Sequence, residues 1–119
     1  SAAGHPLGPT YDRVLDIALT HAALAVCVPP VLPDPFEQGG VAGRVAGIGA
    51  MIVDTAAARG SRVRVFHLAP VFAAAAAATG YGFTIDGVHL SARGADVVAA
   101  AFGDLVATLR RERPVTESG

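Results

Sequence analysis

A continuous apolar run that ends at two prolines constrains the fold of this 119-residue chain more than any other feature. The run covers residues 22–28 and reads AALAVCV, and Pro29 and Pro30 follow it. An apolar run of this length, without alternating polar residues, is typical of a strand buried on both faces of a parallel sheet. Proline ends such a strand because it has no N–H group to donate. The sequence therefore predicts a buried strand over residues 22–28.

The segments around this run predict an alternation of helix and strand. Helical spacing of apolar residues predicts a helix over Thr10–His21, which Thr10 can cap, and another over Val41–Arg59. The apolar face of the first helix is expected at Tyr11, Val14, Leu15, Ala18 and Leu19. A second apolar strand is expected over Val63–Leu68. Strand, helix and strand in this order form a βαβ unit, which implies a parallel sheet. We therefore expect an α/β fold.

The C-terminal part of the chain predicts two more helices. A short alanine-rich helix is expected after Pro70, and a final helix begins at Ser91, which can act as its N-terminal cap. The buried stripe of the final helix is expected at Val98, Phe102, Leu105 and Leu109. In the earlier helix, Gly43, Gly47 and Gly49 each cost about 1 kcal/mol relative to Ala. Their presence predicts close packing of that helix against a neighbour.

Composition excludes several classes of function. The net charge is −1 and 52% of the residues are hydrophobic, so the chain lacks the basic surface that nucleic acids or anionic membranes require. No apolar run reaches the roughly 18 to 20 residues that span a bilayer. The first residues do not resemble a signal peptide, and they predict a chain that begins within a longer sequence. The sequence does not predict the cellular compartment of the protein.

The segment TIDGVHLSARG, residues 84–94, contains a candidate catalytic pair. Asp86 and His89 lie three positions apart in a loop that follows a strand and a short helix, and loops after strands form the sites of α/β proteins. The carboxylate of Asp86 can accept a hydrogen bond from Nδ1–H of His89, which leaves Nε2 free to take a proton from a nucleophile. The alternative is a polar turn that only starts the next helix.

The segment Asp86-Gly-Val-His89-Leu-Ser-Ala-Arg-Gly94, followed by an apolar helix, resembles the last conserved block of the SGNH or GDSL hydrolases. The resemblance implies a Ser-His-Asp triad in which His89 is the general base and Asp86 orients it. It also implies a three-layer, flavodoxin-like fold with a parallel sheet flanked by helices, a small-molecule ester substrate, and no cofactor or metal.

Three other elements of this family are missing from the chain. No Gly-Asp-Ser block supplies a nucleophile, the glycine block of the oxyanion hole is absent, and the sequence contains no asparagine to complete that hole. Residues 1–119 are therefore expected to form the C-terminal portion of a single SGNH-like domain. The nucleophile and the remaining strands would come from a missing N-terminal half or from a companion chain. The alternative is a non-catalytic α/β binding or accessory subunit that kept the fold.

Other reactive side chains favour structural roles. Cys27 lies in the apolar run, where a buried and unreactive thiol is expected rather than a nucleophile. His67 is expected as a packed or edge residue of the second strand. The four histidines have no spacing typical of a zinc site. Tyr81 and Phe83 could line an acyl pocket, although aromatic residues in such positions usually belong to the core.

Overall fold

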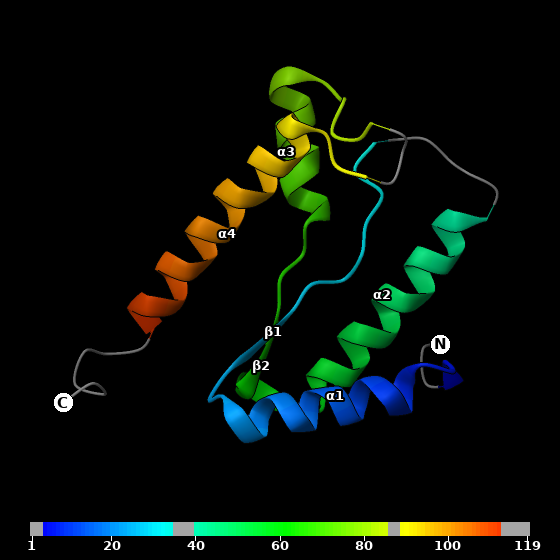
Figure 1. The fold of residues 1–119 in the computed structure, drawn as a ribbon, viewed down its shortest axis with the longest axis vertical. Helices are drawn as coiled ribbons and strands as arrows, with labels where there is room; N and C mark the ends of the chain where they lie inside the picture. Colours follow the sequence, from blue (N-terminus) through cyan, green and yellow to red (C-terminus); the bar gives the residue numbers. More distant parts are fainter. Residues whose placement is uncertain (1–3, 35–39, 86–88, 113–119) are drawn as a thin grey trace.

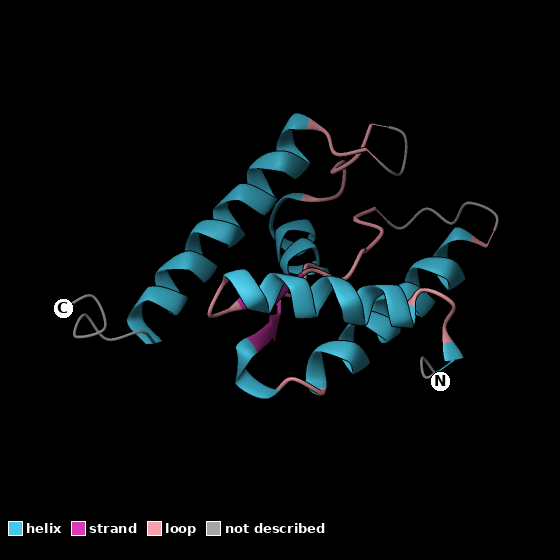
Figure 2. Cartoon of the chain, turned by 60° about the horizontal axis from the view of Figure 1, so that its bottom comes forward, coloured by secondary structure: helices cyan, strands magenta, loops and turns pink. Residues whose placement is uncertain are grey.

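The computed structural model describes residues 4–34, 40–85 and 89–112. It confirms a mixed α/β architecture with a parallel sheet (Figures 1 and 2). In chain order the elements are α1 (Gly8–His21), β1 (Ala25–Cys27), α2 (Val41–Ala57), a 3-10 turn (Gly60–Arg62), β2 (Val63–Val65), α3 (Ala69–Thr79) and α4 (Ala92–Glu112). Every predicted helix and strand is present, and the differences concern where each begins and ends.

The two strands pair in parallel, with Ala25 opposite Val63 and Cys27 opposite Val65. Both strands are shorter than predicted. At the start of the apolar run, Ala22 still belongs to the end of α1, because its N–H donates to the carbonyl oxygen of Ala18 at 2.9 Å. At the other end the prolines cannot donate to a neighbour, so the pairing stops soon after Cys27.

Helix α1 begins earlier than predicted, and Thr10 is not its cap. The N-cap residue is Leu7, which makes no capping hydrogen bond through its side chain, and Pro9 lies in the first turn. Proline suits this position because its φ angle is already helical and its missing N–H needs no partner there. Thr10 is therefore an internal helical residue.

The main core lies where α1 and α2 pack against the sheet. Its buried residues come from both helices and both strands: Leu15, Cys27, Met51, Ile52, Ala56 and Val63. The burial of Cys27, which is 2% exposed, agrees with the prediction for its position. Val14, in contrast, is 52% exposed, although its spacing placed it on the apolar face of α1.

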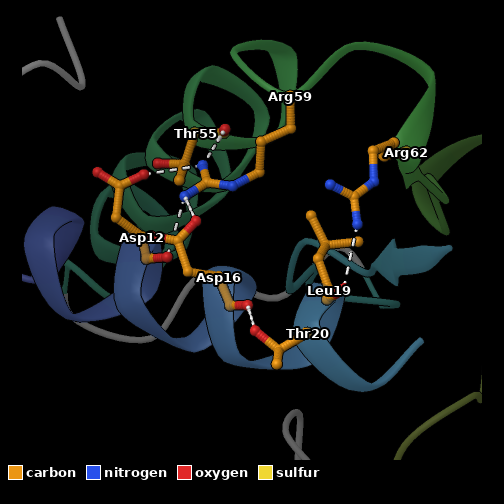
Figure 3. Close-up of polar contacts among 7 residues, drawn as sticks. All are labelled: Asp12, Asp16, Leu19, Thr20, Thr55, Arg59 and Arg62. Atoms are coloured by element: carbon orange, nitrogen blue, oxygen red, sulfur yellow. Dashed lines mark hydrogen bonds and ion pairs between the residues drawn. The ribbon is translucent and has the colours of Figure 1, made fainter. Parts of the chain in front are cut away.

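An arginine just after α2 connects the two helices at the surface of this core (Figure 3). The guanidinium of Arg59 forms ion pairs with Asp12 and Asp16 of α1, each at 2.8 Å. The same group donates to the carbonyl oxygens of Asp12 and Thr55, both at 3.0 Å. The carboxylates are largely exposed, but the Arg59 side chain is only 15% exposed. Arg59 therefore links the end of α2 to α1 through several bonds at once.

Helix α4 lies along the other side of the strand segment from α2 (Figure 1). The ring of Phe102 contacts that of Phe66 with centroids 5.0 Å apart, and Arg64 pairs with Glu112 at 2.5 Å. The predicted apolar stripe of α4 faces the protein, but its residues are only half-buried. The position of the predicted stripe is therefore correct, and its burial is partial.

The chain has an open shape. Its radius of gyration is 16.1 Å and its smallest dimension is 18 Å, whereas a compact domain of this length has a radius of gyration of about 13–14 Å. A Cβ atom added at Gly43 or Gly47 of α2 would meet nothing within 4 Å, and one at Gly49 would make ordinary contact with Pro29. Among the described residues, the close packing predicted for these glycines is therefore absent. None of the helices within the described ranges has the length and apolarity to cross a bilayer.

Candidate functional site

His89 lies on a short antiparallel pairing that precedes α4. Residue Thr84 forms a bridge with Leu90, the N–H of Ile85 donates to the carbonyl oxygen of His89 at 2.9 Å, and the N–H of Ser91 donates to that of Phe83 at 2.8 Å. His89 is exposed on this pairing. Its predicted partner Asp86 lies outside the described residues.

A buried carboxylate holds the first segment of this pairing. Asp34, which is 3% exposed, accepts hydrogen bonds from the backbone N–H groups of Gly82, Phe83 and Thr84, each at 3.0 Å. The hydroxyl of Thr84 donates to the same carboxylate at 2.6 Å. Four donors therefore converge on one side chain from the segment after β1, and they come from residues 48 to 50 positions away.

These bonds determine the charge state of Asp34. Burial alone would raise the pKa of this carboxyl group. The hydrogen bonds from the Thr84 hydroxyl and from the N–H groups of Phe83, Gly82 and Thr84 favour the ionised form, and together they hold the pKa below its ordinary value. Asp34 is therefore a buried anion that is stabilised by donors of the histidine segment, by which we mean the paired residues 82–85 and 89–91.

Arg93 holds the carbonyl groups of the same region. Its guanidinium, in the first turn of α4, donates to the carbonyl oxygens of Gly80 and Tyr81 and to the hydroxyl of Thr79. It also lies 4.6 Å from the ring centroid of Phe83, close enough for a cation–π contact. The anion Asp34 thus binds the N–H groups of this segment, and the cation Arg93 binds its carbonyl groups.

The start of α4 is docked directly onto this segment. Ser91 caps the helix as predicted, because its hydroxyl oxygen accepts a hydrogen bond from the N–H of Gly94 at 3.1 Å. The same hydroxyl donates to the carbonyl oxygen of Gly82 at 2.8 Å. A Cβ atom at Gly94 would lie 2.1 Å from the carbonyl oxygen of Phe83. Only glycine allows the helix and the segment to approach this closely.

An apolar cavity connects the histidine segment to the carboxyl side of the sheet. Its volume is about 380 Å³. Leu90, the neighbour of His89, lies in its wall together with residues from the segments that follow both strands. All the lining residues are apolar: Val28, Pro29, Pro30, Val31, Leu32, Pro33, Val41, Val45, Leu68, Phe72, Leu90 and Val98. His89 therefore lies on the side of the sheet where α/β proteins place their sites.

The other reactive residues do not join His89 in a site. Cys27 is buried in the core, and Ser61 lies in the 3-10 turn before β2, at the amino side of the sheet. His67 is exposed and lies just after β2, so it is neither packed nor an edge residue of that strand. Within the described ranges, no three or more His, Cys, Asp or Glu side chains are arranged to hold a metal ion. Phe83 is fully buried and belongs to an aromatic cluster with Phe72, whereas Tyr81 is 58% exposed.

The sequence does not predict the roles of Asp34 and Arg93. Asp34 lies between two prolines in a loop, a context that is typical of turns. Its partners are distant in the sequence, so no local spacing connects them. The one available signal is its position after a buried strand, on the side where polar groups tend to gather. Arg93 lies within the family-like block, but its spacing does not show that it binds carbonyl groups.

Comparisons with known proteins give no match. No family model fits the sequence, and neither the curated proteins nor the solved structures contain one that is significantly similar to this chain.

Proposed function

We propose that this chain is the C-terminal part of an SGNH-type serine ester hydrolase with a three-layer, flavodoxin-like fold. In this proposal His89 is the general base, Asp86 orients its imidazole, and the nucleophilic serine lies outside this chain. The observation that carries the proposal is the exposed His89, which pairs with a segment that Asp34 and Arg93 hold, at the carboxyl side of a parallel βαβ unit. A general base needs both access to substrate and a fixed position.

The described serines support a nucleophile from elsewhere. Ser91 uses its hydroxyl to cap α4 and to bond Gly82, and Ser61 lies at the amino side of the sheet. Ser1 and Ser118 lie outside the described residues. In the proposed reaction, His89 takes the proton of the external serine as its oxygen attacks the ester carbonyl, and then returns a proton to the departing alcohol. A water molecule then attacks the acyl-serine ester with His89 again as the base, and this step releases the acid and restores the serine.

The open sheet supports the proposal that further strands complete the domain. Within the described residues, each of the two strands has one edge without a strand partner. Unpaired edges favour pairing with additional strands. The apolar cavity beside residues 28–33 offers a surface that such strands would bury. The proposed partner is therefore a missing N-terminal half or a companion chain.

Ester hydrolysis by the product of the complete reading frame tests this function. We expect the product to hydrolyse p-nitrophenyl esters, and His89→Ala to lower kcat by about 10²–10⁴-fold because the general base is lost. Asp86→Asn should give a loss of similar size. The matched control is His21→Ala, which removes an exposed imidazole from the last turn of α1. Equal activity in the His89 and His21 variants would refute the proposed role.

A second function, that of a non-catalytic accessory subunit, is favoured by one observation. Of the two described serines, Ser91 uses its hydroxyl in two hydrogen bonds, and Ser61 lies at the opposite side of the sheet from His89. This alternative predicts that the complete product contains no reactive serine and that His89→Ala changes binding rather than turnover. The reading frame upstream of residue 1 discriminates the two functions, since only the hydrolase requires a Gly-Asp-Ser type block there or in a companion chain.

A further inference from the structure

We propose that Asp34 is a positioning residue for His89. This inference rests on the proposed function, because it assumes that His89 acts as a base. Asp34 binds the backbone of residues 82–84, and its effect on His89 passes through this backbone. Two backbone hydrogen bonds, from Ile85 to His89 and from Ser91 to Phe83, then connect that segment to the histidine.

The contacts of Asp34 require a carboxylate. Every group that it binds is a donor: three N–H groups and one hydroxyl. An ionised carboxylate offers only acceptors, whereas the amide of an asparagine would direct N–H donors at some of these donors. In a buried site the donors that lose their acceptor have no water to replace it. Asp34→Asn therefore keeps the shape of the side chain but replaces one of its two acceptor oxygens by a donor, so part of the hydrogen bonding is lost.

The position of Asp34 explains what its hydrogen bonds to residues 82–84 achieve. Segments that connect regular elements are usually mobile, but a catalytic base has to stay within about 0.5 Å of its productive position. Asp34 belongs to the segment that follows β1, and that segment also forms one wall of the apolar cavity. The bonds to residues 82–84 therefore hold the histidine segment in one place relative to the carboxyl side of the sheet.

Two NMR measurements on the 119-residue chain test this role. The first is the amide hydrogen-exchange rate of Ile85 and Ser91, the donors that flank His89. The second is the tautomer of the neutral His89 ring, read from its ring nitrogen shifts. With Asp86 as acceptor the proton lies on Nδ1. We expect Asp34→Asn to speed both exchange rates by about tenfold or more, and to replace the single Nδ1–H tautomer by a mixture.

Two comparison variants separate positioning from a general loss of stability. Arg59→Met removes the ion pairs between α1 and α2. It should leave the His89 tautomer unchanged, and it should not speed amide exchange at Ile85 and Ser91 relative to the exchange of the whole chain. Asp86→Asn should change the tautomer without speeding exchange at Ser91. If Asp34→Asn does not fold, Thr84→Val replaces it, because that variant removes one of the four donors. A partial gain of the second tautomer is then expected.

The outcomes distinguish the two proposals. A tautomer that changes in Asp86→Asn but not in the Asp34 or Thr84 variant would overturn the positioning role and leave the proposed function standing. A tautomer that is unchanged in Asp86→Asn would count against the proposed function. In that case only the exchange rates test the positioning role. This role is overturned if Asp34→Asn speeds amide exchange at Ile85 and Ser91 no more than Arg59→Met does.

Discussion

Asp34 and Arg93 divide the backbone polar groups of residues 79–84 between them by charge. The carboxylate accepts from N–H groups, and the guanidinium donates to carbonyl oxygens. Hydrogen bonds that involve a charged partner contribute roughly 1.5–3 kcal/mol, more than bonds between neutral groups. Residues 79–84, which pair with the segment that carries His89, are therefore held by strong bonds although they contain little regular structure.

Asp34→Asn should destabilise the chain in a pH-dependent way. Near neutral pH we expect a cost of about 2–3 kcal/mol in the free energy of unfolding, because buried donors lose their acceptor. The pKa of Asp34 in the folded chain lies below its ordinary value of 3.8. Its stabilising contribution is therefore complete above this value and is lost as the pH falls toward the folded-state pKa. Urea unfolding of both proteins across this range measures the difference, and a difference that grows on acidification would contradict the account.

Gly94→Ala tests the close approach of α4 to the histidine segment. The new methyl group would overlap the carbonyl oxygen of Phe83, so we expect a loss of about 1–3 kcal/mol in stability. Gly103→Ala in the same helix is the control, since its methyl group would meet nothing within 4 Å and should stabilise the helix by about 0.5–1 kcal/mol. Thermal unfolding compares the two variants. Equal effects would show that α4 is not docked through Gly94.

At the residue scale, the sequence predicts what local chemistry determines. The prediction that Ser91 caps α4 is confirmed, because capping depends on groups within one helical turn. The four donors to Asp34 could not be predicted, because they reach it only after the chain has folded back over about 50 positions. Asp86 and His89 stay predictions as a catalytic pair.

At the scale of elements, periodicity predicts the order of helices and strands but not their ends. Helix α1 starts before Thr10 because Pro9 favours the first turn, and β1 is short because pairing has to involve both strands. The relative placement of α1 and α2 depends on Arg59, whose two carboxylate partners lie more than 40 positions away. Charge spacing within either helix alone does not reveal this contact.

Arg59→Met should loosen the packing of α1 on α2. The variant keeps an apolar stem but loses two ion pairs and two hydrogen bonds to carbonyl oxygens, so we expect a cost of about 1–2 kcal/mol. Because the carboxylates are exposed, the cost should shrink at high salt. Denaturant unfolding at low and high ionic strength measures both effects. A cost that does not depend on salt would show that the ion pairs contribute nothing.

At the scale of the whole molecule, the open shape follows from a small sheet and an exposed cavity. The chain measures 46 × 36 × 18 Å, and helices α2 and α4 lie on either side of the segment that carries the strands (Figure 1). The apolar residues after β1 are lined up along the cavity between them. The flavodoxin-like arrangement stays a proposal that further strands would have to complete.

The isolated chain should bind a hydrophobic dye such as ANS more strongly than the complete product does. The dye reports accessible apolar surface, which the cavity supplies in the isolated chain and which further strands would cover. Val98→Glu, on the wall formed by α4, should weaken dye binding, whereas a substitution at the exposed Val106 of the same helix serves as the control. Equal dye binding by the chain and the complete product would argue against a covered cavity.

Fluorophosphonate labelling of the complete reading-frame product tests the central claim most directly, because the reagent reacts only with a serine activated by a general base. We predict one labelled serine outside residues 1–119, full labelling in His21→Ala, and a loss of labelling by about 10²-fold or more in His89→Ala. A folded product that takes no label, or one that His89→Ala labels as fast as the unchanged protein, would contradict the account.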